Sequence, residues 1–252
     1  MDTSGIRFFH SGESGTNVVL GSAIDPAINR RVHRLAQSLL RRDDLPSLQL
    51  VPAYSSLLVH FNPLEISRRS LEAEILSSMG ALGDEGPWEE PSRTIKVPVL
   101  YGGERGPDLG QVAEICGLST EEVIALHSSV PYRVYMLGFT PGFPYLGTVP
   151  EKIAVPRLEN PRTEIAAGTI GIAGQQTGIY PVKSPGGWRL IGHTPLAIYD
   201  PIRISPFLFS PGDEVRFMAV TREEYLELTS GAREGSSIDS FIEIAQDRGG
   251  KP

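Results

Sequence analysis

Residues 131–195 carry the pattern that sets the architecture of this chain. From Pro131 to Pro195 they read PYRVYMLGFTPGFPYLGTVPEKIAVPRLENPRTEIAAGTIGIAGQQTGIYPVKSPGGWRLIGHTP, and ten of these 65 residues are glycine and nine are proline. Disordered segments rich in glycine and proline usually lack large aromatic side chains, but this one contains Phe143, Tyr145 and Trp188. We therefore expect a folded region with many tight turns and close backbone approaches.

Short apolar segments separated by turn signals continue from this region to residue 220. Such a pattern favours a closed β-barrel or a sandwich. The expected strands are Arg133–Phe139, Thr169–Ala173, Gly178–Pro181, Trp188–Ile191, Leu196–Tyr199 and Glu214–Val220. After them, Thr221 is placed to cap a helix that runs to Thr229, and residues 238–245 are predicted to form a further helix.

The first hundred residues have a mixed α and β pattern. Asp25 followed by Pro26 is typical of a helix start, and apolar residues then recur at helical spacing to about Arg42. A second helix is predicted after Asn62. The expected strands are Asn17–Leu20, Leu48–Ala53, Ser55–Phe61 and Arg93–Leu100. The resulting order β-α-β-β-α-β predicts a ferredoxin-like N-terminal domain, so the fold class is α+β.

The chain is thus divided into three parts. Residues 1–100 form a small α/β domain, residues 101–220 a β-barrel domain with a helical lead-in, and residues 221–252 a C-terminal helical tail. The lead-in consists of helices over residues 108–116 and 120–128, the second with Thr120 as its N-cap. Residues 80–92, rich in glycine, proline and acids, are predicted to form a loop before the last strand of the first domain.

Charge and composition exclude several classes of protein. The 23 Lys and Arg against 30 Asp and Glu give a net charge of −7, which disfavours a broad basic surface for nucleic acid. No apolar run is long enough for a membrane span, the first residues show no secretion signal, and the single cysteine, Cys116, forms no internal disulfide. We expect a cytoplasmic protein with an inert, buried thiol.

Common catalytic motifs are missing from the sequence. It contains no G-x-x-x-x-G-K-[ST] phosphate loop, no H-E-x-x-H helix and no G-x-S-x-G elbow. The glycine clusters at residues 12–15 and 102–106 lack the spacing of a dinucleotide site. No metal site is predicted.

Three glycine-rich segments within residues 131–195 combine polar and aromatic side chains. They are GFTPGFPYLG (138–147), GIAGQQTGIYP (171–181) and SPGGWRLIGHTP (184–195). Glycine beside a bulky aromatic residue lets backbone N–H groups face a ligand while the ring forms a wall. Barrel turns with core aromatics would give the same pattern, so both alternatives stay open. The whole stretch has four Arg, two Lys and three Glu, which suits an anion.

These segments resemble the allophanate hydrolase subunit 1 family. The resemblance extends to VPAYSSLLVHF (51–61), VPVLYGGERGPDL (97–109) and PRLENPRT (156–163), and it covers residues 17–220. It implies a small α/β domain followed by a cyclophilin-like β-barrel. The chain departs from the family pattern at His193, where arginine is common, and at residues 166–169, which read AAGT in place of PAGS.

The family includes the B-type subunit of an ATP-dependent 5-oxoprolinase. The resemblance therefore implies a hydrolase component, inactive alone, that opens 5-oxoproline to glutamate together with a cyclophilin-like C-type partner and an A-type partner. Because the chain has no phosphate loop, ATP with Mg²⁺ is expected at a shared or partner site. Two alternatives stay open: a component of urea carboxylase or the allophanate pathway, and a binding module that inhibits a sensor histidine kinase.

His127, Arg189 and Gln176 are the candidate catalytic residues. Imidazole exchanges protons near neutral pH, and His127 is expected at the end of a helix that leads into the barrel. Helix capping or core hydrogen bonding is the alternative for this histidine. A guanidinium holds carboxylates or phosphates through forked hydrogen bonds, and a glutamine amide would orient an amide-like substrate.

The candidate substrate-binding residues lie in the same glycine-rich segments and between them. Arginines would hold an anion, hydroxyl and backbone N–H groups would act as donors, and aromatic rings would form walls or contacts with other proteins. The set comprises Phe139, Phe143, Tyr145, Arg157, Arg162, Thr177, Tyr180, Ser184, Gly186, Gly187, Trp188 and His193. His10, His33 and His60 are interpreted as structural.

Overall fold

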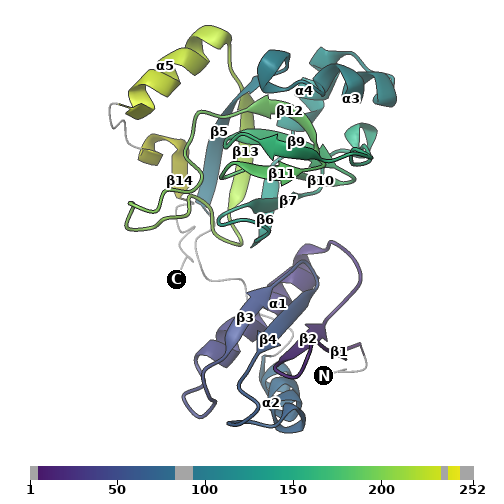
Figure 1. Cartoon of the computed structure of the whole chain (residues 1–252), viewed down its shortest axis with the longest axis vertical. Helices are drawn as coiled ribbons and strands as arrows, with labels where there is room; N and C mark the ends of the chain where they lie inside the picture. The colour runs from purple at the N-terminus through teal and green to yellow at the C-terminus, as the bar shows by residue number, and fades with distance from the viewer. Residues whose placement is uncertain (1–4, 83–92, 234–237, 245–252) are drawn as a thin grey trace, which may run out of the picture. The chain divides into compact units, whose positions relative to one another are not determined.

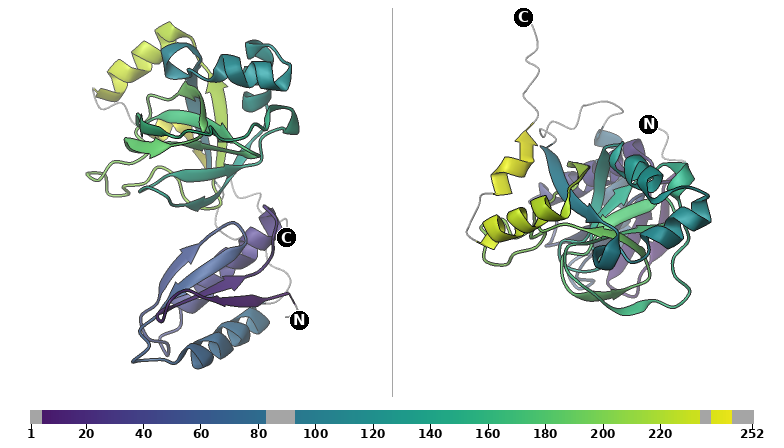
Figure 2. Two further views of the ribbon diagram at one scale, coloured as in Figure 1. Left: turned by 45° about the vertical axis from the view of Figure 1, so that its right-hand side comes forward. Right: turned by 90° about the horizontal axis from the view of Figure 1, so that it is seen from above.

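A computed structural model describes residues 5–82, 93–233 and 238–244. They divide into two compact units, one within Met1–Glu90 and one within Pro91–Pro252, each of which is described by itself (Figures 1 and 2). Most of the loop predicted over residues 80–92 lies outside the described residues.

The described residues of the first unit form a four-stranded antiparallel sheet with two helices. Its strands lie in the order β1-β2-β4-β3. The elements are β1 (Arg7–His10), β2 (Gly15–Val19), α1 (Pro26–Leu40), β3 (Gln49–Pro52), β4 (Ser56–His60) and α2 (Arg68–Ala81). Asp25 caps α1 by accepting hydrogen bonds from two backbone N–H groups. Val18, Leu35, Leu57 and Ile75 are fully buried in its core.

The ferredoxin-like arrangement predicted for this unit is not confirmed. The predicted last strand, over residues 93–100, is β5 (Arg93–Tyr101) and belongs to the second unit, where it pairs in parallel with β13. The fourth strand of the first sheet is instead the short hairpin strand β1, which was not predicted. Ile95, Val97 and Val99 of β5 are fully buried in the barrel core. Alternation identifies such residues as a strand but does not tell which sheet buries them.

The second unit contains a closed β-barrel, which confirms this part of the predicted fold. In the described part of the chain its strands follow the order β12-β9-β10-β7-β6-β13-β5, and β5 closes the ring by pairing with β12. The strands are β5, β6 (Tyr132–Leu137), β7 (Pro144–Gly147), β9 (Thr169–Ala173), β10 (Gln176–Ile179), β12 (Arg189–His193) and β13 (Glu214–Ala219). The specific likeness to cyclophilin stays a prediction.

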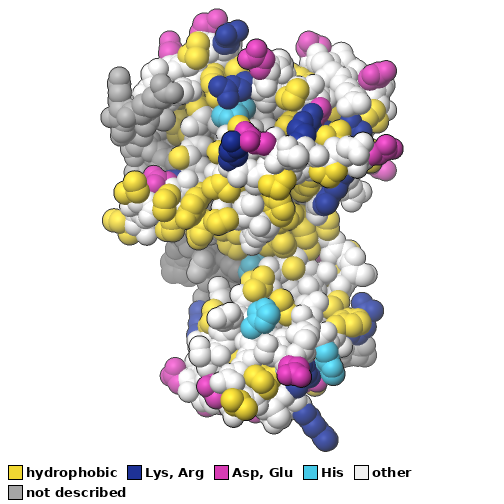
Figure 3. All heavy atoms as spheres, viewed as in Figure 1, with side chains coloured by type: hydrophobic (Ala, Val, Ile, Leu, Met, Phe, Trp, Pro, Cys, Tyr) yellow, Lys and Arg dark blue, Asp and Glu magenta, His cyan; other side chains and the backbone are white. Residues whose placement is uncertain are grey.

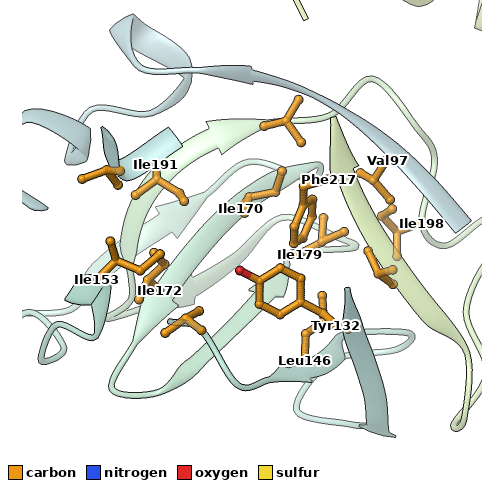
Figure 4. Packing of buried hydrophobic residues seen from close by; sticks show 14 of the residues in the cluster. Val97, Tyr132, Leu146, Ile153, Ile170, Ile172, Ile179, Ile191, Ile198 and Phe217 are labelled. Atoms are coloured by element: carbon orange, nitrogen blue, oxygen red, sulfur yellow. The ribbon is translucent and has the colours of Figure 1, made fainter. Parts of the chain in front are cut away.

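Large apolar side chains fill the interior of the barrel. Tyr132, Ile170, Ile172 and Phe217 point inward from three strands and are at most 2% exposed (Figure 4). Full burial of such a side chain stabilises the fold by about 1.5–3 kcal/mol. Because successive residues of a strand point to opposite sides, Gly171 of β9 faces outward. The barrel wall therefore has a second, outer face that is available for other contacts.

A separate two-stranded ribbon lies outside the barrel ring. It consists of β8 (Arg162–Ile165) and β11 (Ser184–Gly186), which are antiparallel, with Ser184 opposite Ile165 and Gly186 opposite Arg162. Neither strand was predicted, nor was β7. The strand predicted over residues 196–199 is absent, and only Tyr199 forms an isolated bridge, with Phe207.

In the described residues of the second unit, three α-helices accompany the barrel. They are α3 (Leu109–Cys116), α4 (Thr120–Ser128) and α5 (Arg222–Arg233). Ser119, and not Thr120, is the N-cap of α4, because its hydroxyl and the Glu122 carboxylate form a reciprocal capping box. Thr221 caps α5 as predicted.

The helix predicted over residues 238–245 is wrong. The described residues form a single 3₁₀ turn, Ile238–Phe241, and then the short strand β14 (Ile242–Ile244), which pairs with β5. Backbone hydrogen bonds to β5 take the place of those within a helix. Residue 245 lies outside the described residues.

Candidate functional site

Four aromatic residues pack together on the outer side of the barrel wall. Phe143 lies at the centre: its ring centroid is 5.0 Å from that of Tyr145, 5.2 Å from that of Tyr180 and 5.4 Å from that of Trp188, all with edge-to-face geometry. We call Phe143, Tyr145, Tyr180 and Trp188 the aromatic cluster. Edge-to-face pairs add about 0.5–1.5 kcal/mol each beyond the burial of their surface, so the rings are held in fixed positions.

Glycines make room for the aromatic cluster. A Cβ atom at Gly178 would lie 2.8 Å from the Phe143 ring, and one at Gly186 would lie 2.2 Å from the Tyr180 hydroxyl. A side chain at either position would displace an aromatic residue. The glycines of the second and third segments are therefore needed to let rings lie directly on the backbone of the wall and the ribbon.

Positive charge accompanies the aromatic cluster. The Arg157 guanidinium lies 5.9 Å from the centre of the Trp188 ring. Burial raises the pKa of Tyr180 to about 12, although a hydrogen bond with the Trp188 backbone and the nearby charges of Arg157 and Arg162 act to lower it. Burial likewise raises the pKa of Tyr145. Both phenols therefore stay protonated at neutral pH and can donate hydrogen bonds.

Arg162 is held by a buried carboxylate. Its Nη2 donates to Asp108 Oδ1 at 2.7 Å, and the backbone N–H of Leu190 donates to Asp108 Oδ2 at 2.7 Å. Asp108 comes directly before α3, and only 6% of it is exposed. The carboxylate thus ties the ribbon to β12. Sequence patterns assigned Asp108 no site role, because the residue is 54 positions from Arg162 and has the features of a helix start.

Arg189 has a positioning role in this geometry. Its Nη1 donates to Gln111 Oε1 at 2.7 Å and its Nε donates to the Pro156 carbonyl at 2.9 Å. The side chain is buried, and its hydrogen bonds join α3 to the segment that leads to Arg157. The arginine therefore fixes the backbone beside the site.

His127 lies inside the barrel and away from the aromatic cluster. Its Nε2 is 3.0 Å from Thr177 Oγ1, its Nδ1 is 2.7 Å from the Tyr101 hydroxyl, and its ring stacks on Phe217 at 4.6 Å. The Thr177 hydroxyl donates to the Gly171 carbonyl, so it must accept from His127 Nε2–H. His127 Nδ1 then accepts from Tyr101. Every donor in this series of hydrogen bonds has an acceptor.

This network determines what His127 does. The side chain is fully buried, and burial lowers its pKa to about 3, so the imidazole is neutral at pH 7. Its Nε2 proton and its Nδ1 lone pair are both engaged by core residues. The contacts match the alternative of core hydrogen bonding, and Thr177, predicted to bind substrate, belongs to the same interior network.

His193 fastens the C-terminal helix to the barrel. Its Nε2–H donates to the Ala167 carbonyl at 2.8 Å, and the Tyr225 hydroxyl of α5 donates to its Nδ1 at 2.8 Å. Burial lowers the pKa of His193 to about 4, and the charge of Arg105 acts in the same direction. These contacts place His193 in a structural joint and not at the aromatic cluster.

The remaining candidates are divided between the cluster and its margins. Gly186, Gly187 and Ser184 lie on or beside the ribbon, and the Gly187 carbonyl accepts from the Leu158 N–H. Gln176 is the first residue of β10 and is partly buried. Phe139 meets Phe143 edge-to-face at 5.8 Å, has a left-handed φ of 65° and is 61% exposed. It therefore lies at the outer margin of the cluster.

Hydrophobic side chains are also exposed on the loop after β12. Ile202 and Ile204 are almost completely exposed, although a salt bridge between Arg203 and Asp200 and stacking of Tyr199 on Phe207 hold the loop in shape. Figure 3 shows hydrophobic side chains gathered on this face of the barrel unit. The exposed pair is outside the aromatic cluster.

Two other kinds of site are not found in the described residues. Within residues 5–82, 93–233 and 238–244, no group of three or more His, Cys, Asp or Glu is placed to hold a metal ion. None of the helices in these ranges has both the length and the apolar character needed to cross a membrane.

Known proteins are similar to this chain in sequence and in fold. The family model for the carboxyltransferase domain, subdomain C and D, matches residues 6–209. The chain is 44% identical to the B-type subunit of the Escherichia coli O157:H7 5-oxoprolinase, over 84% of its own length and 95% of that protein. It is 39% identical to the Bacillus subtilis protein of the same name, over 85% and 92% of the two chains.

Solved structures give the same result. The chain is 43% identical to TTHA0988, with a TM-score of 0.71, but the match covers 82% of this chain and only 40% of that longer protein. The Kluyveromyces lactis urea carboxylase has a TM-score of 0.77 at 21% identity, over 95% of this chain and 24% of the enzyme, which shows a shared fold. The matches confirm the resemblance predicted from the glycine-rich segments, and the chain belongs to the carboxyltransferase-domain family, subdomain C and D.

Proposed function

We propose that this chain is the B-type subunit of an ATP-dependent 5-oxoprolinase, which converts 5-oxo-L-proline, ATP and water to L-glutamate, ADP and phosphate. The observation that carries this proposal is the 44% identity to the corresponding Escherichia coli protein over 95% of its length. The urea amidolyase of Saccharomyces cerevisiae is only 23% identical, and the match covers 13% of that protein. A cyclic amide is therefore favoured over urea as the substrate.

Opening a lactam requires activation of a poor electrophile. ATP would supply it by phosphorylating the lactam oxygen with release of ADP. A first water would then add to the carbonyl carbon, the ring C–N bond would break and the nitrogen would take up a proton, which leaves an acyl phosphate. A second water would hydrolyse this acyl phosphate to the carboxylate and phosphate. We assign to this chain the binding and orientation of the lactam. The Tyr145 ring is partly exposed and would offer a flat apolar surface beside the buried Trp188 ring, and the protonated hydroxyl of Tyr180, which is also buried, is a hydrogen-bond donor.

The catalytic candidates take different roles in this proposal. His127 and Arg189 act as positioning residues, because their polar atoms are engaged inside the fold. Gln176 is retained as a candidate for orienting the amide. His193 holds α5 and is given no contact with substrate.

The ATP site is proposed to belong to a partner or to be shared with one. The sequence contains no phosphate loop. In the glycine cluster at 102–106, the N–H of Gly102 already donates to Ile191 and that of Gly106 to Gly102, so these groups are not directed at a phosphate. Partners of the C and A types, with Mg²⁺ accompanying ATP, complete the proposed cytoplasmic complex.

Reconstitution tests the function. Glutamate release from 5-oxoproline and ATP should be undetectable with the chain alone and appear when the C- and A-type partners are added. Replacing 5-oxoproline with urea or allophanate tests the carboxylase alternative, and co-purification with a sensor kinase tests the inhibitor alternative. No glutamate release from the complete mixture would contradict the proposal.

Arg157 offers a variant test of the same function. Arg157→Ala should raise the KM for 5-oxoproline by about ten-fold, because it removes a cation beside the Trp188 ring. Arg216, which is exposed and paired with Glu214 on β13, provides a matched control in Arg216→Ala. Equal KM values for the two variants would remove Arg157 from the substrate site.

A further inference from the structure

The ribbon formed by β8 and β11 contains two buried donors without acceptors. Ser184 is 7% exposed, and its Oγ has no hydrogen-bond partner among the described residues. Arg162 Nη1 is likewise shut off from solvent and has no partner within the described ranges. Buried polar groups are nearly always satisfied, so two such atoms on one pair of strands point to a missing bound group.

The ion pair of Arg162 leaves half of its guanidinium free. Asp108 Oδ1 accepts from Nη2 and Asp108 Oδ2 accepts from the Leu190 N–H, and neither oxygen bonds Nη1. A carboxylate that engaged the guanidinium fully would take two parallel hydrogen bonds. Asp108 therefore orients Arg162 but does not use Nη1, which is left for a second acceptor.

The surroundings carry an excess of positive charge. The Arg157 guanidinium lies beside the Trp188 ring and that of Arg162 lies on the ribbon, and within the described ranges Asp108 is the one carboxylate bonded to either of them. The Lys183–Glu164 pair of the ribbon is exposed and balances itself. A bound anion would compensate this charge.

We propose that Arg162 Nη1 and Ser184 Oγ bind the carboxylate of the substrate, with Asp108 as the positioning residue for Arg162. Two donors match the two oxygens of a carboxylate, whereas a phosphate presents three or more oxygens and a larger charge. This inference rests on the proposed function, because it assigns the α-carboxylate of 5-oxoproline to these atoms and its lactam ring to the aromatic cluster.

Binding at these atoms requires the ribbon to move. Both donors are closed off from solvent, so a ligand reaches them only when β8 and β11 lift from the barrel. The ribbon is a separate sheet, and its buried Ile165 packs in one hydrophobic cluster with Phe143, Tyr180 and Trp188. We therefore expect the ribbon to open and to close again over the bound carboxylate.

Calorimetric titration tests the proposal on the chain and on its complex with the C- and A-type partners. The probes are 5-oxo-L-proline, 5-oxo-L-prolinamide, acetate and inorganic phosphate. The acid should bind at least ten-fold more tightly than the amide, and phosphate should not compete. Ser184→Ala should weaken binding of the acid by about five- to ten-fold and leave binding of the amide unchanged.

Matched variants separate binding from folding. Ser184→Ala removes an unsatisfied buried hydroxyl, so its melting temperature should equal or exceed that of the parent chain. Arg162→Lys keeps the charge beside Asp108 but loses the fork, and it should weaken binding of the acid at least ten-fold. Lys183→Ala, which removes an exposed cation next to Ser184 in the sequence, should change neither affinity.

The outcomes show whether the proposed binding site or the proposed function is wrong. Acetate bound through Ser184 and Arg162 without binding of 5-oxoproline would retain the site and overturn the proposed substrate. Turnover of 5-oxoproline with an unchanged KM in Ser184→Ala and Arg162→Lys would retain the function and overturn the site. Equal affinity for acid and amide, preference for phosphate, no binding in either sample, or a crystal structure with only water at these atoms would also overturn it.

Discussion

Two groups of polar side chains in the barrel unit differ in how completely they are satisfied. Inside the barrel, Tyr101, His127 and Thr177 form a network in which each donor meets an acceptor. On the ribbon outside, Arg162 and Ser184 each have a buried donor with no acceptor among the described residues. A complete network stabilises the fold, whereas an incomplete one costs stability and is retained where a ligand completes it.

The largest expected effect is on the interior network. His127→Ala should reduce the free energy of unfolding by about 3–5 kcal/mol, because it leaves a cavity and removes partners from Tyr101 and Thr177. Urea unfolding at pH 7 measures the loss. His10→Ala, at an exposed position of β1, should change stability by less than about 0.5 kcal/mol. A mild effect at His127 together with complete loss of turnover would restore it as a catalytic candidate.

Lowering the pH tests whether His127 and His193 are buried in the neutral form. Burial lowers the pKa of His127 to about 3 and that of His193 to about 4, from an ordinary value of 6.5. The folded state therefore binds fewer protons, so this contribution to stability is complete above pH 6.5 and is lost as the pH falls toward the folded pKa values. Between pH 6.5 and 5 each histidine should cost about 2 kcal/mol.

Unfolding free energies at pH 7 and pH 5 check this expectation. His127→Ala should flatten the pH dependence by about half, since one of the two buried histidines is removed. A parent chain whose stability is the same at both pH values would contradict buried, neutral histidines.

A methyl group added at a glycine that lies against the aromatic cluster should destabilise the fold. Gly178→Ala places a Cβ atom 2.8 Å from the Phe143 ring and should cost about 1–3 kcal/mol through overpacking. Gly110→Ala in α3 has open space around its Cβ and should be neutral or stabilising by up to about 1 kcal/mol. Equal melting temperatures for these two variants would show that the rings do not lie directly on the wall.

Asp108→Asn should have a smaller effect on stability than His127→Ala, and it should also raise the KM for 5-oxoproline. The amide oxygen can still accept from Arg162, but the amide nitrogen then faces the Leu190 N–H and cannot accept from it. Because Arg162 is about one-third exposed, we expect a loss of about 2 kcal/mol. The KM for 5-oxoproline should rise several-fold while kcat changes little, because the guanidinium is less well oriented. Steady-state kinetics of the reconstituted complex measure both. An unchanged KM would show that Asp108 does not orient Arg162 for the substrate.

The barrel could be predicted where local patterns decide the structure. The bounds of β9 match the prediction, because Ile170 and Ile172 alternate with small residues between turn signals. The helices after residue 108 follow from capping and apolar spacing. The assignment of β5 to the wrong sheet had a different cause, since strand pairing with β13 joins residues about 120 positions apart. Long-range register leaves no local signal.

The sequence predicted which types of residue lie at the candidate site, but not which of the named residues lie together. The aromatic residues and Arg157 do gather as expected, whereas Thr177 and His127 lie on the opposite side of the same wall. Adjacent residues of a strand point to opposite faces, so Thr177 and Gly178 are separated by the wall itself. The unsatisfied atoms of Arg162 and Ser184 depend on the pairing of β8 with β11, which no single segment encodes.

Thermal unfolding with and without 5-oxoproline tests the central contrast most directly. Without ligand, His127→Ala should melt well below the parent chain and Ser184→Ala at or above it. With ligand at about 100 times the parent Kd, the parent and His127→Ala should gain about 3 kcal/mol, whereas Ser184→Ala, which binds about five- to ten-fold more weakly, should gain about 1.5–2 kcal/mol. The opposite pattern, a destabilised Ser184→Ala that keeps its full response to ligand, would contradict the assignment of the interior network to folding and the ribbon to binding.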